Sequence, residues 1–310
     1  MNPLQIHYFL QVAQYRSITL ASSEMHVSQP AVSKQILSLE RELEVDLFDR
    51  SGKRLTLTKS GELYYHFFVH TNTEFEDLKR LAKEVNRQPQ QDKLKIRMIF
   101  FIDWDSELFM VPLTKRLEER YPLLEIELEN RGFTDIAQAL TDTKCDLTVC
   151  FDDLVPDRCK PRLNMRHLAD VHRMAFFSVH HPLLMRENLQ FADFRQEFCF
   201  VLSGKQMEAE RATIQTICNQ YGFEPRFRFK PNHDSVIMAT QVGHGYCILD
   251  EWSRNRNNTS FRTLPLEVTR PVSVCWRRDN PNPVIPTAVR TLRELFGQSV
   301  EEPNEAQKDN

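Results

Sequence analysis

Five residues near the start of the chain combine hydrogen-bonding and small apolar side chains at helical spacing: Ser28, Gln29, Pro30, Ser33 and Lys34. The Gln29 amide can donate to and accept from the edge of a base, and Pro30 can press on a thymine methyl group. Both serine hydroxyls and the Lys34 ammonium can reach phosphate oxygens. These residue types predict contacts in the major groove of DNA, with an ordinary solvated helix face as the alternative.

The segment that must position these residues has the pattern of two short helices joined by a tight turn. A first helix is expected over Pro3–Tyr15 and a second over Ile18–Met25, with Ser17 as its N-cap. After a turn at residues 26–27, a third helix begins with Ser28 as its N-cap. Its apolar residues form a stripe that we expect to be buried: Val32, Ile36, Leu39 and Leu43. Such a helix-turn-helix presents the N-terminal end of its last helix to a DNA groove.

A basic hairpin is predicted directly after the third helix. Leu55 and Leu57 alternate with threonines as in a short strand, and Ser51-Gly52 can form the tip. Three cations cluster there: Arg50, Lys53 and Arg54. We expect a wing that contacts the sugar-phosphate backbone, although a solvated run of charges has the same composition.

A long helix is expected from Lys59 to about Asn86, capped by Thr58. Seven residues alternate spacings of four and three along it: Tyr64, Phe68, Thr71, Phe75, Leu78, Ala82 and Val85. This heptad seam predicts pairing of two chains, and hence a two-fold-symmetric DNA site. The alternative is that the seam packs against the globular part of its own chain.

The second half of the chain alternates strands and helices, which predicts a mainly parallel sheet. A polar linker at residues 87–92 precedes it. The first series of elements is expected at 93–101, 107–121, 124–130, 134–143 and 146–151. A second series starts near residue 163, with apolar or periodic segments at 174–179, 198–202, 208–221, 226–229, 235–242, 246–249, 271–276 and 286–296. The polar tail after Gly297 is expected to be disordered.

Composition limits the class of protein. The hydrophobic fraction is 41% and the charged fraction 27%, with no apolar run of membrane-spanning length, so we expect a cytoplasmic protein. The net charge of −3 excludes general coating of nucleic acid but allows a local basic site. The seven cysteines lack metal-ligand spacing, so they are interpreted as reduced thiols, with a redox pair of Cys199 and Cys218 as the alternative. No metal or cofactor is expected.

With these motifs in place, the chain resembles the LysR-type transcriptional regulators over essentially its whole length. The similarity is strongest in SITLASSEMHVSQPAVSKQI from Ser17 to Ile36, ELEVDLFDR from Glu42 to Arg50 and LTLTKSG from Leu55 to Gly61. The resemblance implies an α/β protein with an N-terminal winged helix-turn-helix, a long linker helix and a two-lobed Rossmann-like effector domain similar to periplasmic binding proteins. It also implies a homotetramer on promoter DNA and a small-molecule effector between the lobes.

The domain boundaries expected from the patterns and the resemblance are as follows. The DNA-binding domain takes 1–58, the dimerising linker helix 59–88, the hinge 89–92, the effector-binding domain 93–297 and the disordered tail 298–310. Lobe I takes about 93–162 and 268–297, and lobe II about 163–267.

The expected effector loop departs from the family pattern. Where resembling proteins usually carry small hydroxyl residues, this chain has Asp103 and Asp105 on either side of Trp104. Two carboxylates repel an anion, so we predict a cationic or amine-bearing effector stacked on Trp104. The alternative is an acidic surface loop with an unrelated ligand or none.

Further effector candidates come from the expected strand ends: Asn130, Ser203, Gly204, Lys205, Asp234 and Cys247. Several of them have a structural role as the alternative: Ser203 or Asp234 as a helix cap, Lys205 as a solvated cation and Cys247 as a core residue.

The leading prediction for the function is a ligand-responsive regulator. A constitutive regulator whose second half only oligomerises is the alternative. An enzyme is disfavoured because the sequence has no GxSxG, HExxH or glycine-rich phosphate loop.

Overall fold

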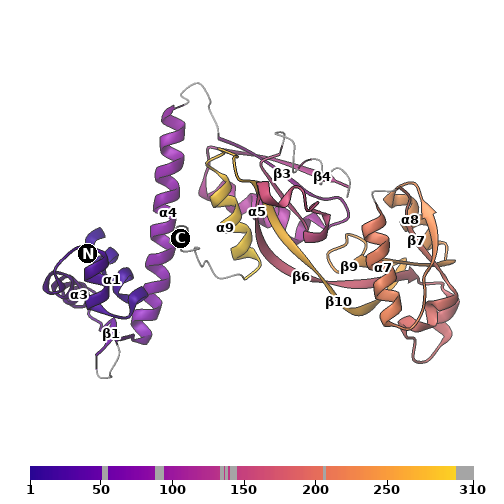
Figure 1. Ribbon diagram of the computed structural model, residues 1–310, viewed down its shortest axis with the longest axis horizontal. Coiled ribbons are helices and arrows are strands. Elements are labelled where there is room, and N and C mark those ends of the chain that lie inside the picture. Colours follow the sequence, from indigo (N-terminus) through magenta and orange to yellow (C-terminus); the bar gives the residue numbers. More distant parts are fainter. Residues whose placement is uncertain are drawn as a thin grey trace. The chain divides into compact units, whose positions relative to one another are not determined.

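The computed structural model describes residues 1–50, 55–87, 94–132, 136, 139, 145–204 and 207–297. The chain divides into two compact units, Met1–Arg87 and Gln88–Asn310 (Figure 1). No helix among the described residues is both long and apolar enough to cross a membrane. The described residues likewise contain no group of three or more metal-ligating side chains placed to hold an ion.

The first unit is built on three short helices: α1 (Pro3–Tyr15), α2 (Ile18–Glu24) and α3 (Gln29–Leu43). Ser17 caps α2 as predicted, since its hydroxyl accepts a hydrogen bond from the amide of Leu20 at 3.3 Å. The predicted stripe of α3 faces the core, with Val32, Ile36 and Leu39 fully buried and Leu43 packed against them. Burial of this side leaves the other side of α3 for solvent or a ligand.

The predicted hairpin pairs β1 (Phe48–Asp49) with β2 (Thr56–Leu57) in antiparallel register. It leads into the long helix α4 (Lys59–Arg87). The Thr58 hydroxyl accepts a hydrogen bond from the amide of Gly61 at 2.9 Å, so Thr58 caps the helix as expected. A Cβ atom at Gly61 would stand 2.0 Å from the carbonyl oxygen of Leu47, so only glycine allows α4 to pass this close to the wing.

The residues of the seam expected on α4 differ in burial along the helix. Phe68 is 2% exposed in the core of the first unit, and Tyr64 packs against the same core. These two residues of the predicted seam therefore contact their own chain, because α4 packs against α1 (Figure 1). Three later members are exposed, namely Thr71, Phe75 and Leu78, and so is Ala82. The side chain of Val85 lies outside the described residues.

The second unit contains one eight-stranded sheet in the order β4-β3-β5-β10-β6-β9-β7-β8. Its strands are β3 (Leu94–Phe101), β4 (Leu124–Arg131), β5 (Leu147–Phe151), β6 (Leu163–Ser178), β7 (Phe198–Leu202), β8 (Arg226–Lys230), β9 (Gly245–Asp250) and β10 (Phe261–Arg277). Parallel pairs lie at both ends of the sheet, β3 with β4 and β5 on one side and β7 with β8 and β9 on the other. The predicted parallel pairing is thus found in the two halves of the sheet, and two long antiparallel strands, β6 and β10, join these halves (Figure 1).

The two joining strands are much longer than the segments expected at 174–179 and 271–276. Residues 163–172 of β6 pair with the end of β10, which itself pairs with β5 of the first half. From Arg173 onward, β6 also pairs with β9 of the second half. Pairing of β6 with the second half of the sheet thus begins near Arg173. On β10, the pairing with β6 has a register irregularity between Pro265 and Thr269.

Four helices of eight or more residues flank this sheet within the described part: α5 (Ser106–Arg120), α7 (Glu208–Gln220), α8 (His233–Gln241) and α9 (Ile285–Leu295). Short 3-10 turns occur at η1 (Asp152–Leu154), η2 (Lys160–Arg162), η3 (Pro182–Met185) and η4 (Phe191–Gln196). The helix expected at 134–143 lies almost entirely outside the described residues, as do the predicted linker and tail.

Candidate functional site

The N-terminal end of α3 carries the predicted DNA-facing residues on its solvent side. Ser28, Gln29, Pro30 and Lys34 are exposed, and Ser33 is half-buried. Ser28 occupies the N-cap position of α3 as predicted, and its carbonyl accepts a hydrogen bond from the amide of Val32 at 3.2 Å, while its side chain makes no capping hydrogen bond. Together these side chains form one polar surface on a helix whose opposite side is fixed by the core.

A buried carboxylate connects α3 to the wing. Glu40 is 7% exposed, and its Oε1 accepts hydrogen bonds from the backbone amides of Leu47 at 2.9 Å and Phe48 at 3.2 Å. Its Oε2 accepts a 2.7 Å charge-assisted bond from Nη2 of Arg50. Glu40 therefore sets both the entry into the hairpin and the direction of Arg50. The other two predicted wing cations, Lys53 and Arg54, lie outside the described residues.

A second candidate site lies in the other unit, where the ends of β3, β7 and β9 converge. Five acidic or basic side chains line a narrow cavity of about 40 Å³ there: Asp103, Arg173, Glu210, His233 and Asp250. Apolar side chains complete it, among them Phe200, Met207 and Val236. This volume holds one or two water molecules, so a larger ligand requires the two halves of the unit to move apart.

A chain of buried ion pairs crosses this site. Arg270 on β10 binds Asp153 of η1 through Nη2 at 2.7 Å and Glu210 of α7 through Nη1 at 2.8 Å. Glu210 also accepts a 2.7 Å hydrogen bond from Arg173 on β6. Burial raises the pKa of Glu210, but the charges of Arg270 and Arg173 outweigh it and hold that pKa below its usual value. Arginines of the two long strands thus alternate in this chain with carboxylates of η1 and α7.

Asp103 lies beside this chain and is fully buried. Its Oδ1 lies 3.1 Å from Nε2 of His233 and accepts a 3.1 Å hydrogen bond from the Asn255 amide. Its Oδ2 is buried without a hydrogen-bond partner among the described residues. Nearby, burial raises the pKa of Asp250 to about 7, although the Arg173 charge opposes this. In this cavity, Oδ2 of Asp103 thus lacks a hydrogen-bond donor among the described residues, and burial brings the pKa of Asp250 close to neutrality.

Comparison with known proteins settles the family. Residues 95–300 match the family model described as "LysR substrate binding domain", and residues 4–62 match "Bacterial regulatory helix-turn-helix protein, lysR family". The chain belongs to the LysR family. It is a DNA-binding transcriptional regulator with a substrate-binding domain.

Curated relatives and solved structures agree with this assignment. The chain is 25% identical over 269 residues to the transcriptional dual regulator GltC of Bacillus subtilis (strain 168), covering 86% of this chain and 87% of that protein. It is 22% identical to the HTH-type transcriptional regulator AlsR of the same organism, covering 92% and 93%. CbnR, a LysR family transcriptional regulator of known structure, has the same fold, with a TM-score of 0.54, 18% identity and coverage of 94% and 100%.

Within this LysR-family regulator, the acidic loop does not form the stacking site that the sequence suggested. Trp104 is 2% exposed and makes edge contacts with Phe151 and Trp252, so neither ring face is open to a ligand. Asp105 caps α5, its side chain accepting a 3.0 Å hydrogen bond from the amide of Glu107. Of the three loop residues, only Asp103 lines the cavity.

The other sequence candidates are dispersed. Cys247 lines the cavity, whereas the exposed residues Ser203, Gly204 and Asp234 do not. Asn232, not Asp234, caps α8, and Asp234 pairs with Arg254 at 3.2 Å. Asn130 is exposed on β4, and Lys205 lies outside the described residues.

Sequence reasoning missed four charged or polar residues that line the cavity, namely Arg173, Glu210, His233 and Asp250. It also missed Arg270, which binds Glu210. One signal was present, since Arg173 and Arg270 stand just before mostly apolar runs that the structure buries, residues 174–178 and 272–275. An arginine inside an apolar strand needs a buried carboxylate, and Glu210 provides it for both.

The cysteines are all free and buried. Burial raises the pKa of Cys218 to about 11 and that of Cys199 well above its usual value. The thiolate is the reactive form, so the alternative of a redox pair at these two residues finds no support in their surroundings.

Proposed function

We propose that this LysR-family regulator reads a two-fold-symmetric promoter site with paired α3 helices and changes its hold on DNA when a small molecule opens its second unit. The observation that carries this proposal is the position of five residues on the solvent side of a helix fixed by the core: the exposed Ser28, Gln29, Pro30 and Lys34 and the half-buried Ser33. Gln29 would read a base edge, while the serines and Lys34 would contact phosphates. Arg50 would contact the backbone from the wing, with Lys53 and Arg54 beside it.

Pairing through α4 is supported by a stripe of exposed side chains. Leu63, Phe67, Phe75 and Leu78 are 56–75% exposed, and Thr71 and Ala82 lie between or beyond them at spacings of three and four. Exposed aromatic and leucine side chains in a row are unfavourable in water and favour a helix partner. We expect a second chain to cover these side chains. In this pairing, Leu63 and Phe67 replace Tyr64 and Phe68 in the seam, because the latter two pack in the core of their own chain. A homotetramer would need a further contact between second units.

We propose that the effector is cationic or amine-bearing because the cavity is lined by three carboxyl groups. Asp103, Glu210 and Asp250 line the cavity together with Arg173 and His233. Oδ2 of Asp103 lacks a hydrogen-bond donor among the described residues, and an ammonium group supplies one. Of the loop residues 103–105, only Asp103 is therefore proposed to contact the effector; Trp104 and Asp105 are not.

The alternative is a constitutive regulator whose second unit only oligomerises. One observation favours it, because Glu210 already neutralises the two arginines and the cavity of about 40 Å³ is almost closed. In either case we propose action in the cytoplasm, on promoter DNA, without enzymatic turnover.

Footprinting on a promoter fragment tests these alternatives. We expect the pure protein to protect two half-sites, and a panel of primary amines such as putrescine and agmatine to shorten or shift the protected region. Asp103→Asn should abolish that shift and leave binding without amine unchanged. A footprint that no amine, carboxylate or cell extract alters would support the constitutive alternative. Protection by a monomeric Phe75→Glu variant equal to that by the native chain would overturn pairing through α4.

A further inference from the structure

A strongly cationic hollow lies in the second unit, away from the cavity described above. It has a volume of about 680 Å³ and is lined by the turn at η2, the start of β6 and the end of β10. Since β10 ends where β5 begins, this hollow lies at the opposite end of these strands from the Asp103 cavity. Its ionisable lining consists of Arg158, Arg162, Arg277, Arg278 and Asp279.

The arginines of this hollow have little compensating charge. Among the described residues, Asp279 supplies the one carboxylate of the lining, and its side chain is 84% exposed and 3.7 Å from Nε of Arg277. That Nε is buried and makes no hydrogen bond within the described part of the chain. The nearby Asp157 is 95% exposed and binds Lys160 at 2.8 Å. Four guanidinium groups around one hollow repel one another unless an anion enters, in a chain whose overall charge is −3.

The backbone that carries these arginines is held firmly. The amide of Arg278 donates to the carbonyl of Arg162 at 3.0 Å, and Nε of Arg278 donates to that of Leu163 at 3.2 Å. These bonds tie the end of β10 to η2, so two of the four arginines keep a fixed separation.

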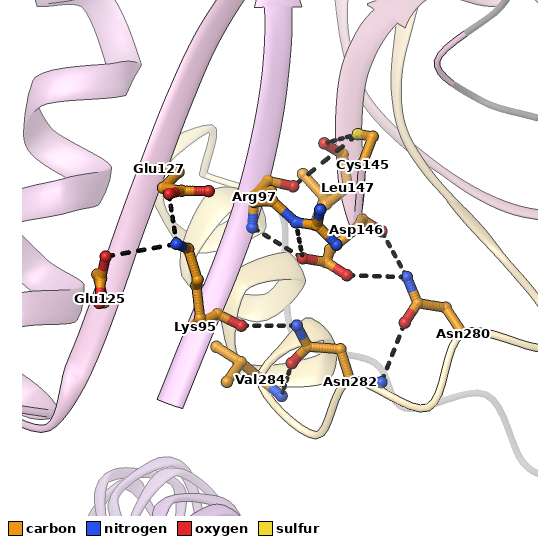
Figure 2. Close-up of polar contacts among 10 residues, drawn as sticks. All are labelled: Lys95, Arg97, Glu125, Glu127, Cys145, Asp146, Leu147, Asn280, Asn282 and Val284. Carbon is orange, nitrogen blue, oxygen red and sulfur yellow. Dashed lines mark hydrogen bonds and ion pairs between the residues drawn. The ribbon is translucent and has the colours of Figure 1, made fainter. Parts of the chain in front are cut away.

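A network of asparagine contacts fixes the following loop (Figure 2). Asn280 donates to the side chain of Asp146 at 3.3 Å, and Asn282 donates to the carbonyl of Lys95 at 2.8 Å. Asp146 in turn accepts a 2.9 Å hydrogen bond from the amide of Arg97. The loop is thus pinned to β3 and to the start of β5, so little entropy is lost at the backbone when an anion binds.

We infer that this hollow is a binding site for a compact polyanion, a metabolite bearing several phosphate or carboxylate groups. Arginine binds such groups with paired, charge-assisted hydrogen bonds. The volume lies within the range of roughly 300–1,000 Å³ that is usual for small-molecule pockets. A concave site of this size fits a small molecule better than the convex backbone of duplex DNA. The inference does not depend on the effector proposed for the Asp103 cavity.

Calorimetric titration of sodium pyrophosphate into the full-length protein, without DNA and at constant ionic strength, tests this site. We expect saturable binding to the native chain. The double variant Arg158→Gln/Arg162→Gln should bind at least roughly tenfold more weakly, since each lost charge-assisted bond costs about that much. The matched control Arg166→Gln/Arg256→Gln removes two exposed arginines that do not line the hollow and should bind like the native chain.

Folding of each variant is checked separately by tryptophan fluorescence, because all three tryptophans lie in the second unit. Saturable binding that is lost in the first variant and kept in the control supports the site. Absence of binding to the native chain, equal binding by the Arg158→Gln/Arg162→Gln variant, or equal losses in both variants would each overturn it. Displacement of pyrophosphate from the hollow by duplex DNA would also overturn it, in favour of a phosphate-backbone contact.

Discussion

At the start of α3, polar side chains face solvent on a helix whose other side is packed, whereas in the Asp103 cavity polar side chains are buried and bind one another. Gln29 and Lys34 are exposed, and their hydrogen-bonding groups are open to an incoming partner. Arg173 is 2% exposed and Arg270 is 4% exposed, and both bind Glu210. The side chains of α3 can therefore bind a partner directly, whereas those of the Asp103 cavity must first break ion pairs with one another.

This difference predicts opposite consequences for mutation. A residue at the exposed site should affect recognition and leave stability unchanged, because no other side chain depends on it. A residue in the buried ion-pair chain should affect stability first, because its removal leaves charges without partners in the interior.

The largest expected effect is at Glu210. Glu210→Gln should lower the free energy of unfolding of the second unit by about 3 kcal/mol or more, since it leaves Arg173 buried without a counter-charge. Urea denaturation followed by tryptophan fluorescence reports this directly, because Trp104, Trp252 and Trp276 all lie in that unit. Glu208→Gln, on the same helix but exposed, should change stability by less than about 0.5 kcal/mol. Equal effects of the two substitutions would show that the ion-pair chain contributes no more than a surface charge.

The second effect is a pH dependence at Asp250. Its pKa of about 7 in the folded chain lies above the ordinary value of 3.8, so folding favours its protonated form. The stability from this group is therefore fully present below about pH 4 and is lost as the pH rises through 7, by roughly 4 kcal/mol in total. Asp250→Asn should remove this slope from the unfolding free energy between pH 4 and 7. The exposed control Asp279→Asn should keep the native slope, and a parallel curve for Asp250→Asn would contradict the raised pKa.

The same contrast explains what could be predicted from the sequence. The bounds of α1 and β7 and the cap at Ser17 follow from residues within a few positions of one another, and all three match the structure. The exposed residues of α3 could be predicted because a buried stripe determines the opposite side of the same helix.

The Asp103 cavity depends on contacts that span much longer stretches of sequence. Trp104 reads as an exposed loop residue until Trp252, nearly 150 positions away, is placed against it. Glu210 reads as a surface residue of an amphipathic helix until two strands bring Arg173 and Arg270 to it. The full length of β6 was missed because polar residues such as His167 and Asp170 alternate with its buried ones on a half-exposed sheet.

A third prediction concerns recognition without a stability change. Gln29→Ala should reduce the preference for a selected DNA site over unrelated duplexes by about 1–3 kcal/mol, because the alanine cannot bond a base edge. Competitive binding with fluorescent duplexes measures this preference, and urea denaturation should give the native midpoint. Gln14→Ala removes an exposed glutamine from α1 and should leave the preference unchanged. An intact preference in Gln29→Ala would mean that another surface reads the sequence.

The smallest expected effect is at Arg50, which is partly exposed and also bound to a buried carboxylate. Arg50 is 44% exposed but binds the buried Glu40 at 2.7 Å, so part of its charge is already neutralised. Arg50→Ala should weaken binding to all duplexes alike and lower the slope of log affinity against log salt by about one. The substitution should also lower the free energy of unfolding, because Glu40 loses a charged partner while keeping its bonds to the backbone amides of Leu47 and Phe48.

The control is Arg41→Ala, which removes an exposed arginine from α3. A native salt slope in Arg50→Ala would assign this arginine to holding the wing against α3 and not to DNA.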